Sequence, residues 1–188
     1  MTVMMHFMRT LVLGFIVWSG TASAQSLALE RITLPPGFSI ERYAQIDGAR
    51  SMAVVDSLNT VFVGTRGSNV YAIIDANRDG KAEGAVRVLS GLRVPNGVAW
   101  KDGYLYVAEQ HRIVRFKANT LETLKRAKAE VLYNKLPDDA AHGWRYAGFG
   151  PDGQLYVSVG APCNICRVQG LEGTIVRLPP TGGAPEIY

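Results

Sequence analysis

Cysteine is scarce in this sequence, and its scarcity removes several kinds of site. The chain has two cysteines, Cys163 and Cys166, in the run Cys-Asn-Ile-Cys. A structural zinc site would need a second pair of such ligands. A c-type haem would need histidine directly after the second cysteine, where Arg167 stands. A disulfide between Cys163 and Cys166, two free thiols and a redox-active pair remain open, and export from the cytoplasm would favour the disulfide.

Long apolar stretches and a large excess of one charge are also missing. The run Thr10–Gly20 is about half the length of a membrane-spanning helix. It follows Arg9 and precedes Ala22-Ser23-Ala24, an order typical of a cleaved secretory signal. We therefore predict a signal peptide over residues 1–24, a mature protein that starts at Gln25 without a membrane span, and a periplasmic or secreted location. The formal net charge is +4 and the basic residues are scattered, which argues against a nucleic-acid partner.

Helical periodicity is nearly absent after the signal. Only residues 118–131 suggest a strand-edge loop or a short helix, and the other segments are short β-type runs separated by Gly, Pro, Asn and Asp. The sequence contains neither the nucleophile elbow of serine hydrolases nor a phosphate-binding or dinucleotide-binding glycine loop. Serine hydrolase and nicotinamide-dependent dehydrogenase functions therefore have no support.

The same order of runs and turns recurs three times. Each copy has an apolar run, a polar turn, a run with an aromatic residue, and a further apolar run. The aromatic moves from Phe62 to Tyr106 to Tyr156, in steps of 44 and 50 residues, a spacing typical of β-propeller blades. We predict an all-β fold, an incomplete β-propeller of about three blades over residues 25–188, with a β-sandwich as the alternative. Because a closed propeller has about four blades or more, we expect this to be the N-terminal part of a longer domain.

His142 is the residue best suited to catalysis. It stands just before the first run of the third copy, a position that lies at the mouth of a propeller's channel, where ligands bind. A histidine there can exchange a proton near neutral pH and act as a general base.

A second candidate site is the stretch from Asp75 to Gly80, which is similar to the start of a calcium-binding loop. Val86 stands where such a loop would end in glutamate. Asp75, Asn77 and Asp79 are therefore weak metal candidates, and a polar hairpin turn is the alternative.

The segment from His142 to Gly160 resembles the pyrroloquinoline quinone-dependent glucose/sorbosone dehydrogenase family. It contains a histidine, seven residues, Gly-Pro-Asp, and an aromatic-containing run that ends in glycine. The runs 161–166, 34–38 and 94–99 are similar to the sorbosone dehydrogenase branch. The resemblance covers residues 30–188 and implies a six-bladed propeller that uses pyrroloquinoline quinone and Ca²⁺.

The resemblance also implies roles for individual residues. In the family, the histidine of this motif takes the proton of a sugar hydroxyl while a hydride passes to the quinone. His142 is thus implied as the catalytic residue, with Asn96 and Arg145 as candidate cofactor contacts. The glucose enzymes have acids where Ala141 and Ala161 stand, which points to a sugar other than glucose. The implied function is a sorbosone-type sugar dehydrogenase, acting on CH–OH or aldehyde groups, with an electron acceptor such as a cytochrome c or a quinone.

Two other functions fit the same sequence. The missing acids also suit a propeller that binds a sugar or a protein without catalysis. A calcium-dependent lactonase would need oxygen ligands around a central metal, for which Asn96, Glu109 and Asn164 are candidates. The family's later cofactor residues would lie beyond Tyr188, so we expect this chain to supply one wall of a site.

Overall fold

A computed structural model describes residues 28–188, so the predicted signal peptide lies outside the described residues. The described chain divides into two units, residues 28–41 and residues 42–188. The first unit holds a 3₁₀ turn, η1 (Leu29–Arg31), and a second turn closed by a hydrogen bond from the Phe38 amide to the Pro35 carbonyl. All the sheets belong to the second unit.

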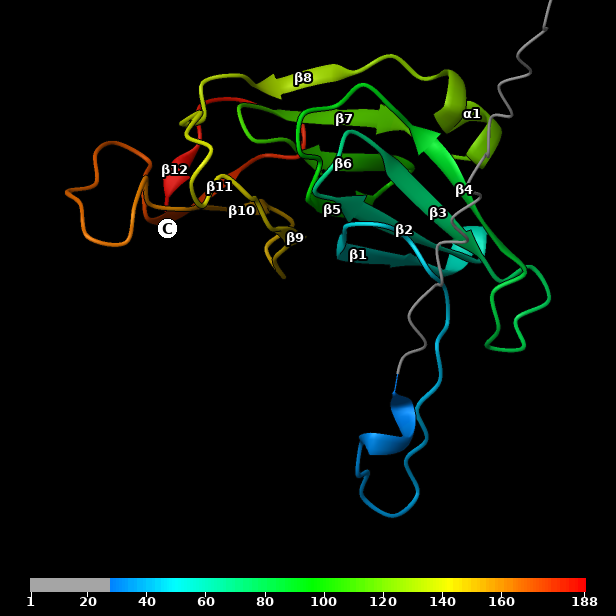
Figure 1. Ribbon diagram of the computed structural model, residues 1–188. Coiled ribbons are helices and arrows are strands. Elements are labelled where there is room, and N and C mark those ends of the chain that lie inside the picture. The colour runs from blue at the N-terminus through cyan, green and yellow to red at the C-terminus, as the bar shows by residue number, and fades with distance from the viewer. Residues whose placement is uncertain (1–27) are drawn as a thin grey trace, which may run out of the picture. The chain divides into compact units, whose positions relative to one another are not determined.

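The second unit contains three four-stranded antiparallel sheets, each with its strands side by side in chain order (Figure 1). The first sheet comprises β1 (Ala49–Val55), β2 (Thr60–Thr65), β3 (Val70–Ile74) and β4 (Gly84–Leu89), with η2 (Asp56–Leu58) between β1 and β2. The second comprises β5 (Gly97–Lys101), β6 (Tyr104–Ala108), β7 (Ile113–Lys117) and β8 (Glu130–Tyr133). The third comprises β9 (Ala147–Phe149), β10 (Leu155–Val159), β11 (Thr174–Leu178) and β12 (Glu186–Ile187). Each sheet is one blade of a β-propeller, which confirms the predicted fold class.

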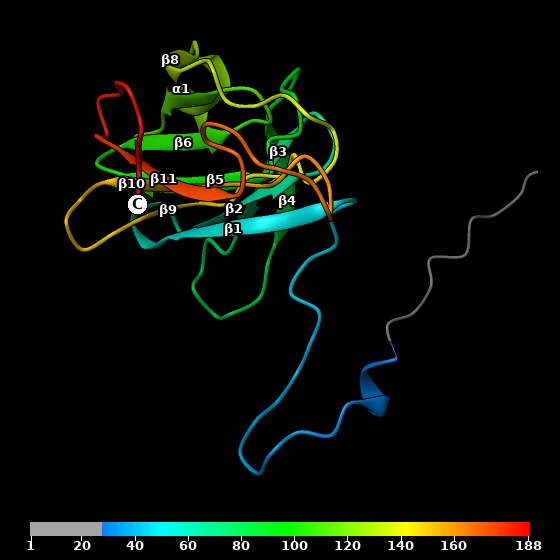
Figure 2. The ribbon, with the colours of Figure 1, turned by 90° about the vertical axis from the view of Figure 1, so that its left-hand side faces the viewer.

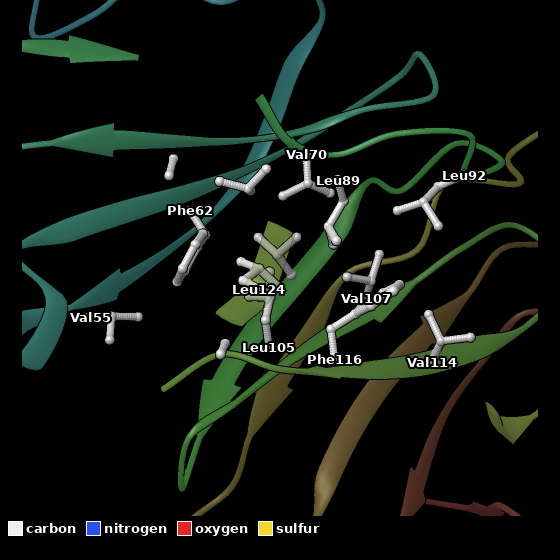
Figure 3. Packing of buried hydrophobic residues seen from close by; sticks show 14 residues of the cluster. Val55, Phe62, Val70, Leu89, Leu92, Leu105, Val107, Val114, Phe116 and Leu124 are labelled. Atoms are coloured by element: carbon white, nitrogen blue, oxygen red, sulfur yellow. The ribbon is translucent and has the colours of Figure 1, made fainter. Parts of the chain in front are cut away.

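Strand β6 shows how the blades pack on each other. Leu105 and Val107 belong to the apolar cluster shared with the first blade, and Tyr106 and Ala108 belong to the cluster shared with the third. Successive side chains of a strand point to opposite faces of the sheet. Because the second blade is covered on both faces, this strand is apolar at nearly every position rather than at alternate ones. Figure 3 shows Leu105 and Val107 in the first cluster, with Phe62 of β2.

The aromatic residue of the repeat belongs to the face toward the following blade. Phe62 lies in the cluster between the first and second blades. Tyr106 lies in the cluster between the second and third, where its ring meets the ring of Phe149 edge-on with centroids 4.9 Å apart. Tyr156 holds the same place in the third blade and meets the ring of Tyr188 edge-on at 5.1 Å. At Phe62 and Tyr106 the aromatic of the repeat therefore serves the packing of one blade on the next.

Helix α1 (Leu121–Arg126) occupies six residues of the segment for which a loop or short helix was expected. The Thr123 amide donates to the Thr120 hydroxyl oxygen at 3.0 Å, which caps the first turn. Leu124 is fully buried in the cluster between the first two blades. Helix α1 packs against β4 of the first blade and β7 of the second. Figure 1 shows it near the end of β4, and Figure 2 gives a second view of the helix. None of the helices within residues 28–188 has the length and apolarity needed to cross a bilayer.

Gly64 in β2 lies where the next blade's backbone approaches most closely. A Cβ atom on Gly64 would lie 2.3 Å from the Asn96 carbonyl oxygen and 2.5 Å from that of Pro95. We expect Gly64→Ala to lower the free energy of unfolding by about 1–3 kcal/mol, because the backbone must shift to make room. Gly84→Ala in β4 is the matched control, since nothing lies within 4 Å of its Cβ position. Denaturant titration compares the variants, and equal stability would contradict this account of the blade contact.

Candidate functional site at the His142 rim

The candidate residues gather at one rim of the blades. In an antiparallel meander, the first strand of a sheet begins, and the second ends, at the same edge. The pairing of β1 with β2, β5 with β6 and β9 with β10 therefore brings the two ends of each pair to a common rim. The residues within two positions of these strand ends are Arg50, Arg66, Asn96, Gln110 and Gly160. His142 precedes β9 by five residues and lies against Gly160.

His142 is exposed on this rim, with its ring held by a single backbone group. Its backbone adopts the left-handed region, with φ of 50°. The imidazole Nδ1 lies 3.0 Å from the Ala161 carbonyl oxygen. Since a carbonyl oxygen can only accept a hydrogen bond, this contact assigns the proton of the neutral imidazole to Nδ1. Nε2 then keeps a free lone pair, which is the state that a general base requires.

Gly160 makes this arrangement of His142 sterically feasible. A Cβ atom on Gly160 would lie 2.2 Å from the His142 carbonyl oxygen and 2.8 Å from the His142 Cβ. The absence of a side chain lets the chain after β10 pass directly beside His142 and brings the Ala161 carbonyl to the ring. The main chain of Ala161 therefore orients the imidazole, at a position where sequence reasoning looked only for an acidic side chain.

Arg145 points into the protein rather than into the open rim. Its side chain is 1% exposed, and Nε and Nη2 donate to the Gln110 carbonyl oxygen at 3.2 and 3.0 Å. Nη2 also donates to the Pro137 carbonyl oxygen at 2.5 Å. Burial lowers the pKa of this guanidinium, and the nearby carboxylates of Asp138 and Asp139 oppose that shift. The predicted contact of Arg145 with a cofactor gains no support from this position, because the residue instead ties the His142 loop to the second blade.

Gln110 fastens the same loop from the second blade, a role that sequence reasoning missed. Its side-chain Nε2 donates to the carbonyl oxygens of Asp139, at 2.7 Å, and Asp138, at 3.3 Å. A Cβ atom on Gly143 would lie 2.4 Å from the Asp139 carbonyl oxygen and 3.0 Å from Gln110 Nε2, so the loop is tightly folded here. The two hydrogen bonds from the Gln110 side-chain amide hold the backbone of the loop before β9 in one conformation, although the loop is polar.

Asn96 and Glu109, two further polar residues beneath the rim, form hydrogen bonds within the protein. Asn96 is 8% exposed, and its Nδ2 donates to the Arg145 carbonyl oxygen at 2.6 Å. Glu109 is fully buried; its Oε1 accepts from the Arg93 amide at 2.7 Å and its Oε2 from Arg112 Nε at 2.5 Å. Both carboxylate oxygens of Glu109 are thus engaged, which gives no support to a metal ligand there. Asn96 Oδ1 is buried without a partner among the described residues, so a cofactor contact at Asn96 stays a prediction.

The weak metal candidates lie on the opposite rim. Asp75, Asp79 and Glu83 have carboxylate oxygens within 4.8 Å of one another, in the loop between β3 and β4. The Asp75 carboxylate accepts the amides of Asp79 at 3.2 Å and Gly80 at 3.1 Å, as a polar hairpin turn would. Asn77 likewise accepts the Asp79 amide, at 3.0 Å. Since this loop leaves the end of a third strand, it belongs to the edge of the blade away from His142. Within residues 28–188 we therefore assign no calcium site near the imidazole.

The two cysteines lie in the loop between β10 and β11, which follows the His142 contact. Cys163 and Cys166 are joined by a disulfide. Figure 1 shows this loop, in orange, extending away from the third sheet. Both cysteines are exposed, and Ile165 between them is 96% exposed.

Comparison with known proteins supports the fold. No protein-family model matches the chain, and no curated protein matches its sequence. The PQQ-bound form of aldose sugar dehydrogenase from Streptomyces coelicolor aligns with 73% of this chain and 46% of its own, at 17% identity and a TM-score of 0.55. The holo pyranose dehydrogenase PQQ domain from Coprinopsis cinerea aligns with 74% of this chain and 38% of its own, at 12% identity and a TM-score of 0.56.

A calcium structure of a Trichoderma reesei enzyme of carbohydrate-active family AA12 aligns with 62% of this chain and 30% of its own, at 16% identity and a TM-score of 0.54. The chain thus spans less than half the length of each of these structures. At such identities the likeness establishes the fold alone, the β-propeller that PQQ-dependent sugar dehydrogenases have.

Proposed function

We propose that this chain is the His142-bearing part of an exported, pyrroloquinoline quinone-dependent sugar dehydrogenase of the sorbosone type. The observation that carries the proposal is the His142 imidazole, exposed on the rim with Nδ1 bound to the Ala161 carbonyl and Nε2 left free. The propeller shared with solved sugar dehydrogenases supports it. The predicted signal peptide suits a periplasmic or secreted enzyme.

The residues of this rim fit the proton-transfer half of such a reaction. Nε2 of His142 accepts the proton of the sugar hydroxyl, and the Nδ1–H bond to the Ala161 carbonyl stabilises the resulting imidazolium. Gln110 and Arg145 hold the loop so that the ring keeps this direction. Pyrroloquinoline quinone, when bound, supplies the hydride acceptor.

The charge of the rim also suits a cofactor that carries carboxylates. Two acids of this region are paired with arginines: Asp138 with Arg93 at 2.7 Å and Glu109 with Arg112 at 2.5 Å. The described carboxylate cluster lies on the other rim, so we derive no step through calcium. The quinone would supply the hydride-accepting chemistry at this wall of the site, and His142 would take the proton of the sugar.

The proposal is tested with the intact gene product supplied with pyrroloquinoline quinone and assayed for sugar-dependent dye reduction. We expect His142→Ala to lower the rate by about 10²–10⁴-fold, the usual contribution of a positioned base. His111→Ala is the comparison variant, since it removes the other histidine of residues 28–188, which follows Gln110 in the turn between β6 and β7. Unchanged activity in the His142 variant would remove the assigned role.

A propeller that binds a sugar or a protein without catalysis is the second candidate. It is favoured by Ala141 and Ala161, which leave the imidazole without an acidic neighbour directly before it or directly after Gly160. This candidate predicts that the intact gene product leaves the absorption spectrum of the quinone unchanged. A spectral shift on titration would contradict this candidate, and the dye-reduction assay of the His142 variant then tests catalysis.

A further inference from the structure

Trp144 lies beside two arginines that belong to a different blade. Its side chain is 45% exposed, on the segment that leads into β9. The guanidinium carbon of Arg66 lies 4.1 Å from the centre of the indole ring, and that of Arg50 lies 5.7 Å away. Arg50 is in β1 and Arg66 follows β2. The first and third blades therefore meet here, and we call Arg50, Arg66 and Trp144 the arginine–tryptophan cluster.

The positive charge of the arginine–tryptophan cluster is not balanced by an acid. Across residues 28–188, the ion pairs of the protein involve other lysines and arginines, and none includes Arg50 or Arg66. A cation–π contact with an exposed ring is a weak interaction, and two guanidinium groups near one ring repel each other. A bound anion would relieve this repulsion and accept several of their N–H groups.

The indole is exposed because of the local backbone. Residues 143–147 alternate between buried and exposed positions: Gly143, Arg145 and Ala147 are buried, and Trp144 and Tyr146 are exposed. Arg145 takes the inner position because its guanidinium donates hydrogen bonds there to the carbonyl oxygens of Gln110 and Pro137. Trp144 is therefore turned outward two residues from His142, with apolar surface available to a ligand.

We propose that the arginine–tryptophan cluster binds a ring compound that carries a carboxylate. The guanidinium groups of Arg50 and Arg66 hold the carboxylate, as planar forks of donors do, and the ring lies against the indole of Trp144. Two sources share this chemistry: a carboxylated sugar such as a uronate, and pyrroloquinoline quinone, which carries three carboxylates. This binding stands on the cluster itself and does not require His142 to be catalytic.

The first measurement is tryptophan fluorescence of the intact gene product titrated with glucuronate, with neutral glucose as the matched ligand. Trp144→Phe separates the fluorescence of Trp144 from that of the other two tryptophans, Trp18 and Trp100. We expect glucuronate to change the Trp144 signal, and we expect its affinity to fall as salt is added, because the contact is between charges near the surface. Equilibrium dialysis with pyrroloquinoline quinone, with and without glucuronate, provides the second arm. Competition between glucuronate and pyrroloquinoline quinone would show that both bind the same site. If only one of them binds, that compound class is the ligand of the cluster.

Arg66→Gln and Arg50→Gln test the role of each cation. We expect each to weaken carboxylate binding by about 10- to 100-fold, the loss typical of one charge-assisted interaction. Arg87→Gln, an exposed arginine of β4, should leave the affinity unchanged. The arginines are exposed, so thermal unfolding should be unaltered. The proposal is overturned if neither ligand binds at millimolar concentration, if glucose binds as well as glucuronate, or if both glutamine variants bind as the wild type does.

Discussion

Gly160→Ala is expected to disable the His142 site while leaving the blades folded. The added methyl would lie 2.2 Å from the His142 carbonyl oxygen, so either that residue or the chain after β10 must move. Displacement breaks the bond between Nδ1 and the Ala161 carbonyl, and a reacting group misplaced by about 1 Å costs roughly 100-fold in rate. We expect that loss in dye reduction, together with about 1–3 kcal/mol of unfolding free energy.

Gly67→Ala is the matched control for Gly160. Gly67 also lies just after the second strand of a blade, but its Cβ position meets only the Thr65 hydroxyl, at 3.7 Å. Nitrogen chemical shifts of the His142 imidazole report its tautomer without requiring activity. In the wild type we expect the proton on Nδ1, and in Gly160→Ala a mixture of the two neutral tautomers. The same tautomer in both proteins would show that Gly160 does not position the ring.

We expect Arg145→Met to lower the free energy of unfolding strongly, although methionine keeps much of the arginine's apolar volume. The change removes the donors that bind the carbonyl oxygens of Gln110 and Pro137, and a buried group left without its partner costs about 1–3 kcal/mol. With two carbonyls affected, we expect a loss of about 2–5 kcal/mol in the free energy of unfolding. Methionine fills much of the volume of the arginine stem, so the missing hydrogen bonds account for most of the loss.

Arg87→Met provides the comparison at an exposed position of β4, where we expect less than about 0.5 kcal/mol. Arg145→Lys should fall between the two, because a lysine keeps a positive charge but loses the two-pronged contact with Gln110. Denaturant unfolding of the three variants measures these differences. A loss at Arg145 no larger than at Arg87 would mean that the buried guanidinium does not hold the loop.

Much of the fold could be predicted because its causes are local. The short apolar runs of the strands and the repeated turns follow from strand chemistry and from glycine, proline and aspartate in the turns. The aromatic spacing reflects an equivalent place in each blade, which at Phe62 and Tyr106 makes the contact with the following blade. His142 could be singled out for the same reason, since its place before a first strand fixes the rim on which it lies.

The fine structure of the site depended on contacts distant in the sequence. By residue type, Trp144 would be expected inside and Arg145 outside, and the structure has them the other way round. Arg145 is buried because carbonyls of Gln110 and Pro137 converge on that point, and sequence pattern does not record where a carbonyl points. The same holds for the bond from His142 to the Ala161 main chain, which depends on the missing side chain of Gly160.

The sequence by itself determined that this is an all-β chain of repeated blades, and it singled out His142. It did so because hydrophobic period and turn chemistry are properties of neighbouring residues. Only the tertiary structure decided which groups meet His142 on its rim, and that the carboxylates of the Asp75 loop do not. It also joined Trp144 to Arg50 and Arg66, which are at least 78 positions away in the sequence. Such contacts between residues distant in the sequence arise from the stacking of whole blades, so no local sequence pattern predicts them.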